Sequence, residues 1–418
     1  MNPIRNIITK QSQFFENTSP LELVQEFGSP LYVYNETILR KRCRELKNLV
    51  SYPHFSVNYS VKANNNLTLL KIIRDEGLNV DAMSPGEIFI EKKAGFLPEQ
   101  ILYISNNVSE EEMKYAIQEG VTISVDSLSQ LEQLGRIHSG GKVCVRFNSG
   151  VGAGHHEKVI TGGEHTKFGI HTNYIPQVKQ LIKKYNLQLI GINQHIGSLF
   201  MESKSYLEGV RSILNIAQQF ENLEFVDLGG GFGIPYHKYE NEPRLNLQEL
   251  GKQLDQILYN WTHSYGKDIL FKVEPGRYIV AECGLLLGTV HSIKQNSQTK
   301  YIGTDLGFNV LIRPTLYDSH HDIEIYRASN TPSLHKEKVT IVGNICESGD
   351  IIAKDCFLPQ LYENDILGVL DAGAYGYCMS SNYNNRLRPA EVLIRSNGDI
   401  SLIRRRDTLE DLLRNFEV

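Results

Sequence analysis

The stretch Phe55-Ser56-Val57-Asn58-Tyr59-Ser60-Val61-Lys62-Ala63-Asn64 decides how the rest of the chain is interpreted. Apolar and polar residues alternate as far as Val61, which is the period of a half-buried strand. A lysine then stands where the strand should end, before a polar asparagine turn. Taken alone, such a lysine most often packs its stem on the protein while its amine reaches water. The alternative is an amine that desolvation makes nucleophilic, and the remainder of the chain decides between the two.

Strand-like and helical segments alternate along the chain after this point. Eight runs have the character of strands: Phe55–Val61, Asn79–Ala82, Ile101–Ile104, Val121–Val125, Lys142–Phe147, Leu189–Asn193, Phe225–Leu228 and Leu270–Val273. Segments with helical spacing lie between them: Leu67–Glu76, Pro85–Ala94, Glu110–Glu119, Ser127–Ile137, Ile175–Tyr185, Tyr206–Gln219 and Leu247–Tyr265. Such alternation, with glycine after several helical segments, is typical of βα units on a parallel sheet, and eight strands close a (β/α)8 barrel.

The pattern changes after Cys283, where short alternating runs follow each other without long helices. These runs are Leu285–Ile293, Tyr301–Thr304, Ile323–Tyr326, Val339–Val342, Ile366–Leu370 and Ala390–Ile394. They predict an antiparallel β domain of sandwich or barrel type. The expected fold class is therefore α/β, a (β/α)8 TIM barrel over residues 36–282 plus a β domain formed by residues 1–35 and 283–418. The early run Leu31–Tyr34 can add a strand to either domain.

Composition excludes several classes of protein. The 418 residues are 41% hydrophobic and 22% charged, with a net charge of -5, which argues against a nucleic-acid binder held by bulk charge. The six cysteines are scattered without a CxxC pair, as expected for free thiols in a reducing compartment. No signal-peptide pattern and no membrane-length apolar run is present. We expect a cytoplasmic protein with no membrane partner.

Polar residues stand at most of the predicted strand ends, where a (β/α)8 barrel places its active site. They are Lys62, Asp81, Asn106, Asp126, Asn148, His195, Gly229-Gly230-Gly231 and Glu274. Aspartate and asparagine also begin helices as N-caps, so a capping role explains several of them equally well. The lysine, the histidine and the glutamate are not capping types, and their occurrence at three strand ends favours a functional site.

Two of these strand ends are suited to an anionic ligand. The successive glycines Gly229, Gly230 and Gly231 let backbone N–H groups approach a phosphate, at the usual phosphate site of such barrels. Glu274-Pro275-Gly276-Arg277 ends the eighth strand. A carboxylate there can hold a proton on a ring nitrogen, and an arginine can bind a phosphate or a carboxylate. A purely structural glutamate–arginine pair is the alternative.

His195-Ile196-Gly197-Ser198 follows the sixth predicted strand, and its imidazole can stack on an aromatic cofactor or transfer protons. No cysteine cluster or second histidine with metal-ligand spacing accompanies it. His155 and His156 are adjacent but lack supporting carboxylates. We interpret them as polar loop residues and expect no metal site.

A Schiff-base lysine, a glycine phosphate site, a carboxylate for a pyridinium nitrogen and a stacking histidine together describe a site for pyridoxal 5'-phosphate. In this interpretation the cofactor binds covalently to Lys62, and Glu274 keeps its ring nitrogen protonated. A protonated ring is the better electron sink, so it stabilises the carbanion left when a substrate loses CO2 or a Cα proton.

Seven motifs are spread over nearly the whole chain. They are Tyr59-Ser60-Val61-Lys62-Ala63-Asn64, Gly162-Gly163 followed by Lys167-Phe168-Gly169, His195-Ile196-Gly197-Ser198, Gly229-Gly230-Gly231, Glu274-Pro275-Gly276-Arg277, Cys346-Glu347-Ser348-Gly349-Asp350 and Asp371-Ala372-Gly373-Ala374-Tyr375-Gly376. With these motifs the chain resembles the fold-type III pyridoxal phosphate decarboxylases. The resemblance is strongest to the branch that converts meso-2,6-diaminopimelate to L-lysine, the last step of lysine biosynthesis.

The resemblance implies a role for each matching residue. The cofactor-binding residues would be Lys62, Asp81, His195, Ser198, Gly229, Gly230, Gly231, Glu274, Gly276, Arg277 and Tyr375. The substrate-binding residues would be Arg277, Arg313, Tyr317, Glu347 and Tyr375, with Glu347 binding the distal amino group of an amino-acid substrate. Lys62 and Cys346 would be catalytic, Cys346 as the proton donor after CO2 loss. The family completes each active site across a head-to-tail homodimer, in which the Cys346 loop reaches the partner's barrel.

The residues themselves agree in outline with the role of Cys346. A thiol beside a carboxylate in a glycine-containing loop is a plausible proton donor, because the neighbouring negative charge favours the protonated form. A buried cysteine without any chemistry is the simpler interpretation when the resemblance is set aside.

Several related activities stay open. Ornithine, arginine or carboxynorspermidine decarboxylases, alanine racemases and enzymes of a carrier-bound substrate share the fold. Racemases usually follow the lysine with a Tyr-Gly-His type turn where this chain has Asn64-Asn65-Asn66, and ornithine-type enzymes carry aspartate where Glu347 stands. Outside the class, a non-catalytic pyridoxal phosphate-binding protein is the alternative. The presence of Lys62, Glu274 and Cys346 together favours an enzyme.

Overall fold

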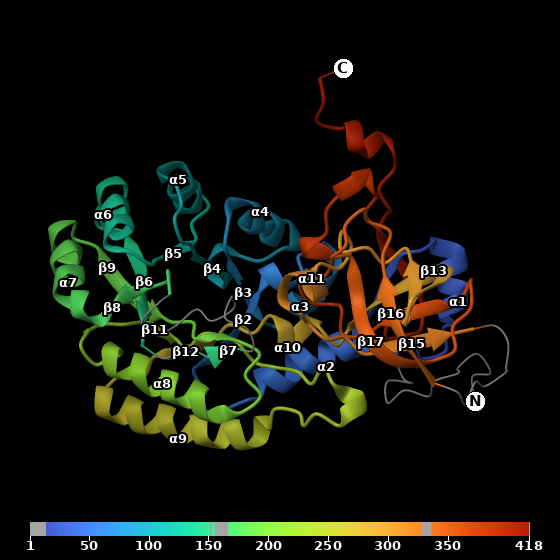
Figure 1. Ribbon diagram of the computed structural model, residues 1–418. Coiled ribbons are helices and arrows are strands. Elements are labelled where there is room, and N and C mark those ends of the chain that lie inside the picture. The colour runs from blue at the N-terminus through green and yellow to red at the C-terminus, as the bar shows by residue number, and fades with distance from the viewer. Residues whose placement is uncertain (1–13, 151–152, 155–165, 328–335, 418) are drawn as a thin grey trace. The chain divides into compact units, whose positions relative to one another are not determined.

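The structure is a computed structural model that describes residues 14–150, 153–154, 166–327 and 336–417 (Figure 1). The chain divides into two compact units. The barrel unit comprises Arg40–Ile234 and Pro243–Ile279, and the sheet unit comprises Met1–Leu39, Pro235–Glu242 and Val280–Val418. Within the described ranges, no helix combines the length and the apolar character that crossing a bilayer requires.

Parallel strands form a closed ring in the barrel unit. They are β2 (Phe55–Ser60), β3 (Asn79–Ala82), β4 (Ile101–Ile104), β5 (Thr122–Val125), β6 (Lys142–Asn148), β9 (Gln188–Asn193), β11 (Phe225–Asp227) and β12 (Leu270–Val273). They pair in the order β5-β4-β3-β2-β12-β11-β9-β6, and pairing of β5 with β6 closes the ring. The predicted (β/α)8 barrel is confirmed. Short strands β7 (Ala153–Gly154), β8 (Ile170–His171) and β10 (Gly197–Ser198) lie beside it.

Helices flank the barrel strands (Figure 1). They are α2 (Glu36–Lys47), α3 (Leu67–Asp75), α4 (Pro85–Ala94), α5 (Glu110–Gln118), α6 (Leu128–Ile137), α7 (Ile175–Lys184), α8 (Ser203–Ala217) and α9 (Leu247–Tyr265), with the short α10 (Arg277–Val280) after β12. The Ser84 side chain caps α4 by accepting the N–H of Glu87, and Gly95 ends that helix in the left-handed conformation at φ 94°. Gly266 ends α9 in the same way at φ 77°. Glycine serves at both helix ends because it adopts a positive φ without a Cβ clash.

The sheet unit is built on one nine-stranded sheet. Its strands are β1 (Leu31–Asn35), β13 (Gly284–Asn296), β14 (Thr299–Thr304), β15 (Ile323–Tyr326), β16 (Lys336–Val342), β17 (Ile351–Pro359), β18 (Ile366–Val369), β19 (Ala390–Ile394) and β20 (Ile400–Arg404). Two helices, α1 (Pro20–Phe27) and α11 (Arg313–Tyr317), belong to the same unit. The early run at Leu31 joins this sheet between β13 and β19.

The expectation of an antiparallel β domain holds for most of this sheet. Two pairs differ, because β1 runs parallel to β19 and β14 runs parallel to β16. Strands β17 and β20 are not among those predicted from the sequence. The burial of β17 follows no simple alternation, and its pairing with β16 is interrupted by register shifts, so the period-two signal of a strand is lost there.

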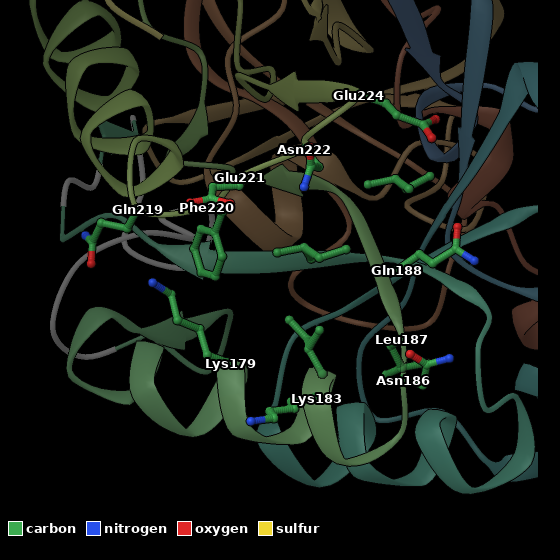
Figure 2. A pocket seen from close by; sticks show the side chains of 13 residues that line it. Lys179, Lys183, Asn186, Leu187, Gln188, Gln219, Phe220, Glu221, Asn222 and Glu224 are labelled. Atoms are coloured by element: carbon green, nitrogen blue, oxygen red, sulfur yellow. The ribbon is translucent and has the colours of Figure 1, made fainter. Parts of the chain in front are cut away.

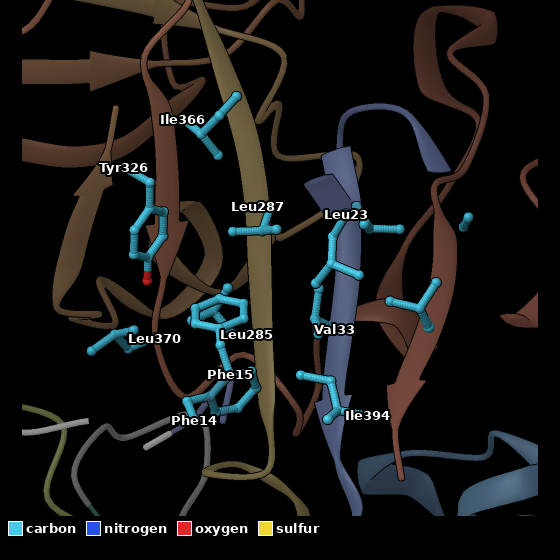
Figure 3. Close-up of a cluster of buried hydrophobic side chains, with 13 residues drawn as sticks. Phe14, Phe15, Leu23, Val33, Leu285, Leu287, Tyr326, Ile366, Leu370 and Ile394 are labelled. Carbon is cyan, nitrogen blue, oxygen red and sulfur yellow. The ribbon is translucent and has the colours of Figure 1, made fainter. Parts of the chain in front are cut away.

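Apolar side chains at every second position of three neighbouring strands form the core of the sheet unit (Figure 3). Leu31 and Val33 of β1 are fully buried, as are Leu285 and Leu287 of β13. Phe15 packs edge-to-face on Tyr326, with ring centroids 5.5 Å apart. Burying each such side chain stabilises the fold by about 1.5–3 kcal/mol. The six cysteines are all free thiols, as predicted.

Candidate functional site

The carboxyl ends of β2, β3, β9, β11 and β12 bring the predicted residues of the barrel unit together. The Ser60 hydroxyl, at the end of β2, donates to Oδ2 of Asp81 at 2.7 Å and contacts the Glu274 carbonyl oxygen at 3.1 Å. The Gly230 N–H, in the loop after β11, donates to Nδ1 of His195 at 3.3 Å. Residues far apart in sequence therefore meet at one rim of the barrel.

Lys62 lies directly beyond β2, in the 3-10 turn η1 (Val61–Ala63). Its side chain is partly buried. The positive charge of Lys62 lowers the pKa of Asp81 and of Glu274, and it lowers the pKa of His195 as well. Lys62 is therefore close enough to Asp81, Glu274 and His195 to act on them electrostatically.

Asp81 is fully buried in β3. Burial raises its pKa to about 7, against the lowering effect of Lys62 and of the Ser60 hydroxyl. The helix that follows β3 is capped by Ser84. The capping interpretation of Asp81 is therefore wrong, and its carboxyl belongs to the rim.

Glu274 follows β12 and is 4% exposed. Burial raises its pKa to about 7, and the carboxyl of Asp81 adds to this effect. Its Oε1 has no hydrogen-bond donor among the described residues, whereas Oε2 lies 3.8 Å from Nδ1 of His195. A buried carboxylate oxygen without a donor is suited to accept a proton-bearing group of a ligand.

His195 is the neutral imidazole of the rim. Its Nδ1 accepts the N–H of Gly230, so this nitrogen carries no proton. Burial lowers the pKa of His195 well below its ordinary value, and the positive charges of Lys62 and Arg146 lower it further. The short distance to Glu274 is thus not an ion pair.

The glycine run after β11 allows a close approach of backbone segments. A Cβ at Gly230 would stand 1.9 Å from the carbonyl oxygen of Glu274, and one at Gly229 would stand 2.4 Å from that of Gln194. Gly229 also has a φ of +78°, which disfavours any side chain. These glycines are needed for the packing of the barrel rim itself, and the N–H groups of Gly229 and Gly230 donate to Asp227 and His195.

Ser198 and Arg277 meet although 79 residues separate them, because Arg277 Nη2 donates to Ser198 Oγ at 2.9 Å. Ser198 lies in β10, and Arg277 begins α10 directly after Gly276. A hydroxyl and a guanidinium beside the glycine run form a donor set that suits a phosphate or a carboxylate.

The remaining predicted residues lie in the sheet unit. Arg313 is 2% exposed, and its guanidinium contacts Nε2 of His321 at 2.8 Å, whereas Tyr317 ends the same helix α11. Cys346 and Glu347 are exposed in the loop between β16 and β17. This loop contacts the 3-10 turn η7 (Tyr383–Asn385), since Tyr383 donates its hydroxyl to Oε1 of Glu347 at 2.6 Å.

Tyr375 lies in the turn after β18 and adopts a φ of +55°. Such a value is uncommon for a bulky residue and marks a position that the surrounding structure holds in place. His155, His156, Gly162 and Gly163 lie outside the described residues.

Buried charges at the barrel rim include residues that the sequence did not single out. Arg146 of β6 is 8% exposed and lies with its guanidinium carbon 4.7 Å from the ring centroid of Phe168. Asp227, the last residue of β11, is fully buried. Glu87 is only partly buried, and it accepts the N–H of Met83 at 2.7 Å. Arg146 had a detectable signal, because it is a charged residue inside an otherwise apolar strand.

A cavity of about 660 Å³ opens at the opposite ends of the strands (Figure 2). Lys179 and Lys183 of α7 line it, together with Phe220 and the first residues of β9. Because β9 begins at Gln188, this cavity lies at the amino ends of the barrel strands. It contains none of the predicted site residues, and barrels of this type carry their chemistry at the other end.

Comparisons with a family model, with related sequences and with solved structures all indicate the same protein family. A family model described as the pyridoxal-dependent decarboxylase, pyridoxal binding domain, matches residues 36–281. The diaminopimelate decarboxylase of Methanothermobacter thermautotrophicus is 42% identical over 408 residues, which are 95% of this chain and 94% of that protein. The diaminopimelate decarboxylase of Escherichia coli strain K12 is 33% identical over 408 residues, 94% of this chain and 95% of that protein.

A solved structure of diaminopimelate decarboxylase from Helicobacter pylori, complexed with L-lysine, has a TM-score of 0.86 and 30% identity to this chain, covering 94% of this chain and 98% of that chain. The family model spans more than half of the chain, and the relatives match nearly all of it. This chain therefore belongs to the family of pyridoxal-dependent decarboxylases, in the branch of the diaminopimelate decarboxylases.

Proposed function

We propose that the protein decarboxylates meso-2,6-diaminopimelate to L-lysine and CO2 with pyridoxal 5'-phosphate as its cofactor. The observation that carries this proposal is the full-length likeness to diaminopimelate decarboxylases, one of them with L-lysine bound in its crystal structure. We further propose that the reaction takes place in the cytoplasm and that residues 36–282 form the cofactor-binding domain.

The barrel rim fits pyridoxal phosphate in three respects. Lys62 supplies an amine, Glu274 presents a buried oxygen that lacks a donor among the described residues, and Ser198 and Arg277 supply polar donors. When bound, the cofactor supplies an electron sink for the pair of electrons released as the substrate carboxylate leaves. Amino-acid side chains supply no such sink, so those at the rim bind and orient the ligands and move protons.

We assign Lys62 the covalent attachment of the cofactor aldehyde, because an amine is the only side-chain group that forms a Schiff base. The Glu274 carboxylate would hold the proton of the ring nitrogen. The neutral His195 would lie against the cofactor, since an uncharged imidazole does not compete with the ring nitrogen for that carboxylate. Ser198, Arg277, Gly276 and the glycine run hold the phosphate, and Asp81 and Tyr375 complete the binding residues.

Substrate recognition needs groups for two carboxylates and two amines. We assign the carboxylates to Arg277, Arg313 and Tyr317, and the distal amino group to Glu347, whose exposed carboxylate has the opposite charge. Cys346 donates the proton that replaces CO2 at Cα. These sheet-unit residues act in a homodimer in which the Cys346 loop of one protomer completes the barrel site of its partner.

Related amino acids are the alternative substrates. Ornithine, arginine and carboxynorspermidine also carry a distal amino or guanidino group, and a carrier-bound substrate would place a larger group at the same point. Glu347 bears on this choice through substrate length, because the glutamate side chain is longer than the aspartate that ornithine-type enzymes carry there.

A substrate panel tests this proposal. Purified protein with added pyridoxal phosphate is incubated with meso-diaminopimelate, lysine, ornithine and arginine, and the released CO2 is measured. We expect release from meso-diaminopimelate above all others, and none from the Lys62→Ala variant. Faster release from ornithine or arginine would show that the substrate assignment is wrong, and release from no substrate would leave only a cofactor-binding protein.

A further inference from the structure

Two acidic side chains meet at the adjoining ends of β11 and β12. Strands β11 and β12 pair in parallel with Asp227 opposite Lys272, and the Leu228 N–H donates to the Lys272 carbonyl at 2.9 Å. The Glu274 N–H donates to the Gly229 carbonyl at 3.0 Å. This ladder carries the Asp227 and Glu274 side chains to the same place inside the barrel.

Each of the two carboxyl groups has one oxygen that is available to the other carboxyl group. Asp227 Oδ1 accepts the Gly229 N–H at 2.9 Å, and Oδ2 has no donor among the described residues. Glu274 Oε2 faces His195, and Oε1 has no donor there either. The two side chains are nevertheless within hydrogen-bonding reach of each other. Two ionised carboxylates cannot form such a contact, so the pair holds a proton between them.

Burial favours the neutral form of a carboxyl, so the proton is placed on Asp227, the more deeply buried of the two. Burial raises the pKa of Asp227 well above its ordinary value, and the neighbouring Glu274 raises it further. Burial is the main cause that raises the pKa of Glu274 to about 7, and the contact with Asp227 acts in the opposite direction and lowers it. The exposed fraction is 0% for Asp227 against 4% for Glu274.

Further charges face the pair from the surrounding elements. They are Lys272 on β12, Cys144 and Arg146 on β6, Asp81 on β3, Lys62 on η1, His195 after β9 and Tyr206 on α8. The cations exceed the other anions in this set, which favours one negative charge on the pair. The Lys272 amine lies 4.3 Å from the ring centroid of Phe225 and is itself almost buried.

We propose that Asp227 is a positioning residue that acts through Glu274. Its protonated carboxyl donates a hydrogen bond to Glu274 and so holds that side chain as a correctly oriented anion, whose remaining lone pairs accept the N–H of the cofactor ring. Without this donor, the buried Glu274 takes up a proton itself and no longer stabilises a pyridinium nitrogen. The inference rests on the proposed function, since it names the device that keeps the cofactor ring protonated.

Two substitutions separate the hydrogen bond from the charge. Asp227→Asn keeps an oxygen for the Gly229 N–H and offers an amide N–H to Glu274. Asp227→Leu has a similar size and offers neither. If Asp227 has only a structural role, the two variants should differ from each other in stability alone. If Asp227 donates a hydrogen bond to Glu274, they should also differ in the protonation of the cofactor ring nitrogen.

The first readout is the pyridine nitrogen itself. Wild type and both variants are loaded with pyridoxal phosphate carrying 15N in the ring, and the nitrogen chemical shift is measured. We expect the protonated signal in wild type and Asp227→Asn, and the unprotonated signal in Asp227→Leu, with a kcat lower by roughly 10- to 100-fold, the range for losing a partner that orients a ligating group. A protonated signal in Asp227→Leu overturns the inference.

The second readout needs neither cofactor nor activity. The C=O stretch of a protonated carboxylic acid is recorded by infrared difference spectroscopy of the cofactor-free protein at neutral pH. We expect Asp227→Asn, which is close to isosteric and leaves the Gly229 contact in place, to lose one such band. Glu91→Gln is the control, because Glu91 is a separate buried acid outside the pair and should remove a different band. An Asn variant with the wild-type spectrum overturns the inference.

Failure of the inference is distinct from failure of the proposed function. If wild type binds no pyridoxal phosphate and releases no CO2, the proposed function and this inference fall together. If wild type decarboxylates meso-diaminopimelate and Asp227→Leu keeps a protonated ring nitrogen, only the inference falls.

Discussion

At the scale of the residue, the barrel rim concentrates buried acids whose protonation the fold controls. Asp81 and Glu274 both have a pKa raised to about 7, and burial is the leading cause in each case. Lys62 opposes this effect at both positions. A cofactor bound to the Lys62 amine changes the charge at that position. The pKa values of the neighbouring acids therefore change as well, as they do in any cluster of interacting titratable groups.

Glu91 of α4 offers a residue-scale prediction about stability. Its side chain is fully buried, neither oxygen has a donor in the described structure, and burial raises its pKa from 4.5 to about 9. A native state that keeps this proton loses stability as pH rises above the unfolded pKa, by about 1.4 kcal/mol per pH unit until the folded pKa is reached. Glu91→Met removes that penalty and an unsatisfied carboxyl, worth about 1–3 kcal/mol.

The measurement is thermal or urea unfolding of wild type and Glu91→Met at about pH 5.5 and about pH 7.5. The stability gain of the Met variant should be larger at the higher pH. Glu111→Met, at an exposed position of α5, is the matched control and should leave the pH dependence unchanged. An equal gain at both pH values would show that Glu91 is ionised in the folded protein.

The residues of the rim were predictable to different degrees. Lys62, His195 and Glu274 were found from the sequence because they end strands and are not helix caps. Asp227 was not singled out, because an aspartate at a strand end is commonly explained as a helix N-cap. Only its proximity to Glu274 in the structure argues for another role. Asp81 was found but shared that ambiguity until the structure placed its carboxyl on Ser60.

At the scale of the element, the pattern of apolar and polar residues explains why the strands and helices of the barrel could be predicted from the sequence. Each βα unit buries one stripe of its helix and both faces of its strand, so strong periodicity marks every element. The sheet unit has weaker signals. Strand β20 is half-exposed along its length and lies at the edge of the sheet, and neither feature produces an apolar run.

The loop after β11 carries the element-scale prediction. A methyl group at Gly230 would stand 1.9 Å from the Glu274 carbonyl oxygen, which is backbone and cannot turn away. Gly230→Ala must therefore separate the ends of β11 and β12. We expect a loss of about 1–3 kcal/mol or more, as for other overpacked sites, and a weaker affinity for pyridoxal phosphate in a spectroscopic titration.

Gly86→Ala is the control for this variant. Its new methyl would meet only the Ser84 hydroxyl at 3.6 Å, and a helix gains up to about 1 kcal/mol when alanine replaces glycine. Wild-type cofactor affinity and stability in Gly230→Ala would contradict the close approach of the two strand ends.

At the scale of the whole molecule, the residues predicted for the site are divided between the two units of the chain. The barrel residues follow from a rule about strand ends, whereas Arg313, Tyr317, Cys346, Glu347 and Tyr375 came from the family resemblance alone. No general rule places chemistry in a mixed β-sheet, so spacing within the sheet unit carried no signal of function. Their roles, unlike their positions, stay predictions.

Mixing two inactive variants tests the proposed shared site. Lys62→Ala lacks the amine of the barrel, and Cys346→Ala lacks the proton donor of the sheet unit. If each barrel is completed by the partner's Cys346 loop, a hybrid dimer has one intact site. We expect the mixture, after subunit exchange, to decarboxylate faster than the mean of the two variants alone.

The control mixture combines Lys62→Ala with Glu274→Ala. Both changes lie in the barrel unit, so every site of the hybrid lacks one of the two groups. Recovery in this control as well, or no recovery in the first mixture, would argue against sites shared between protomers.

The central claim is that Lys62 anchors pyridoxal phosphate at the barrel rim. The most direct measurement is reduction of the cofactor-loaded protein with borohydride, followed by mass spectrometry of its peptides. The account predicts a stable pyridoxyl phosphate group on the peptide that contains Lys62, and its loss in Lys62→Ala. A label on another lysine with Lys62 unmodified, or no label at all, would contradict it.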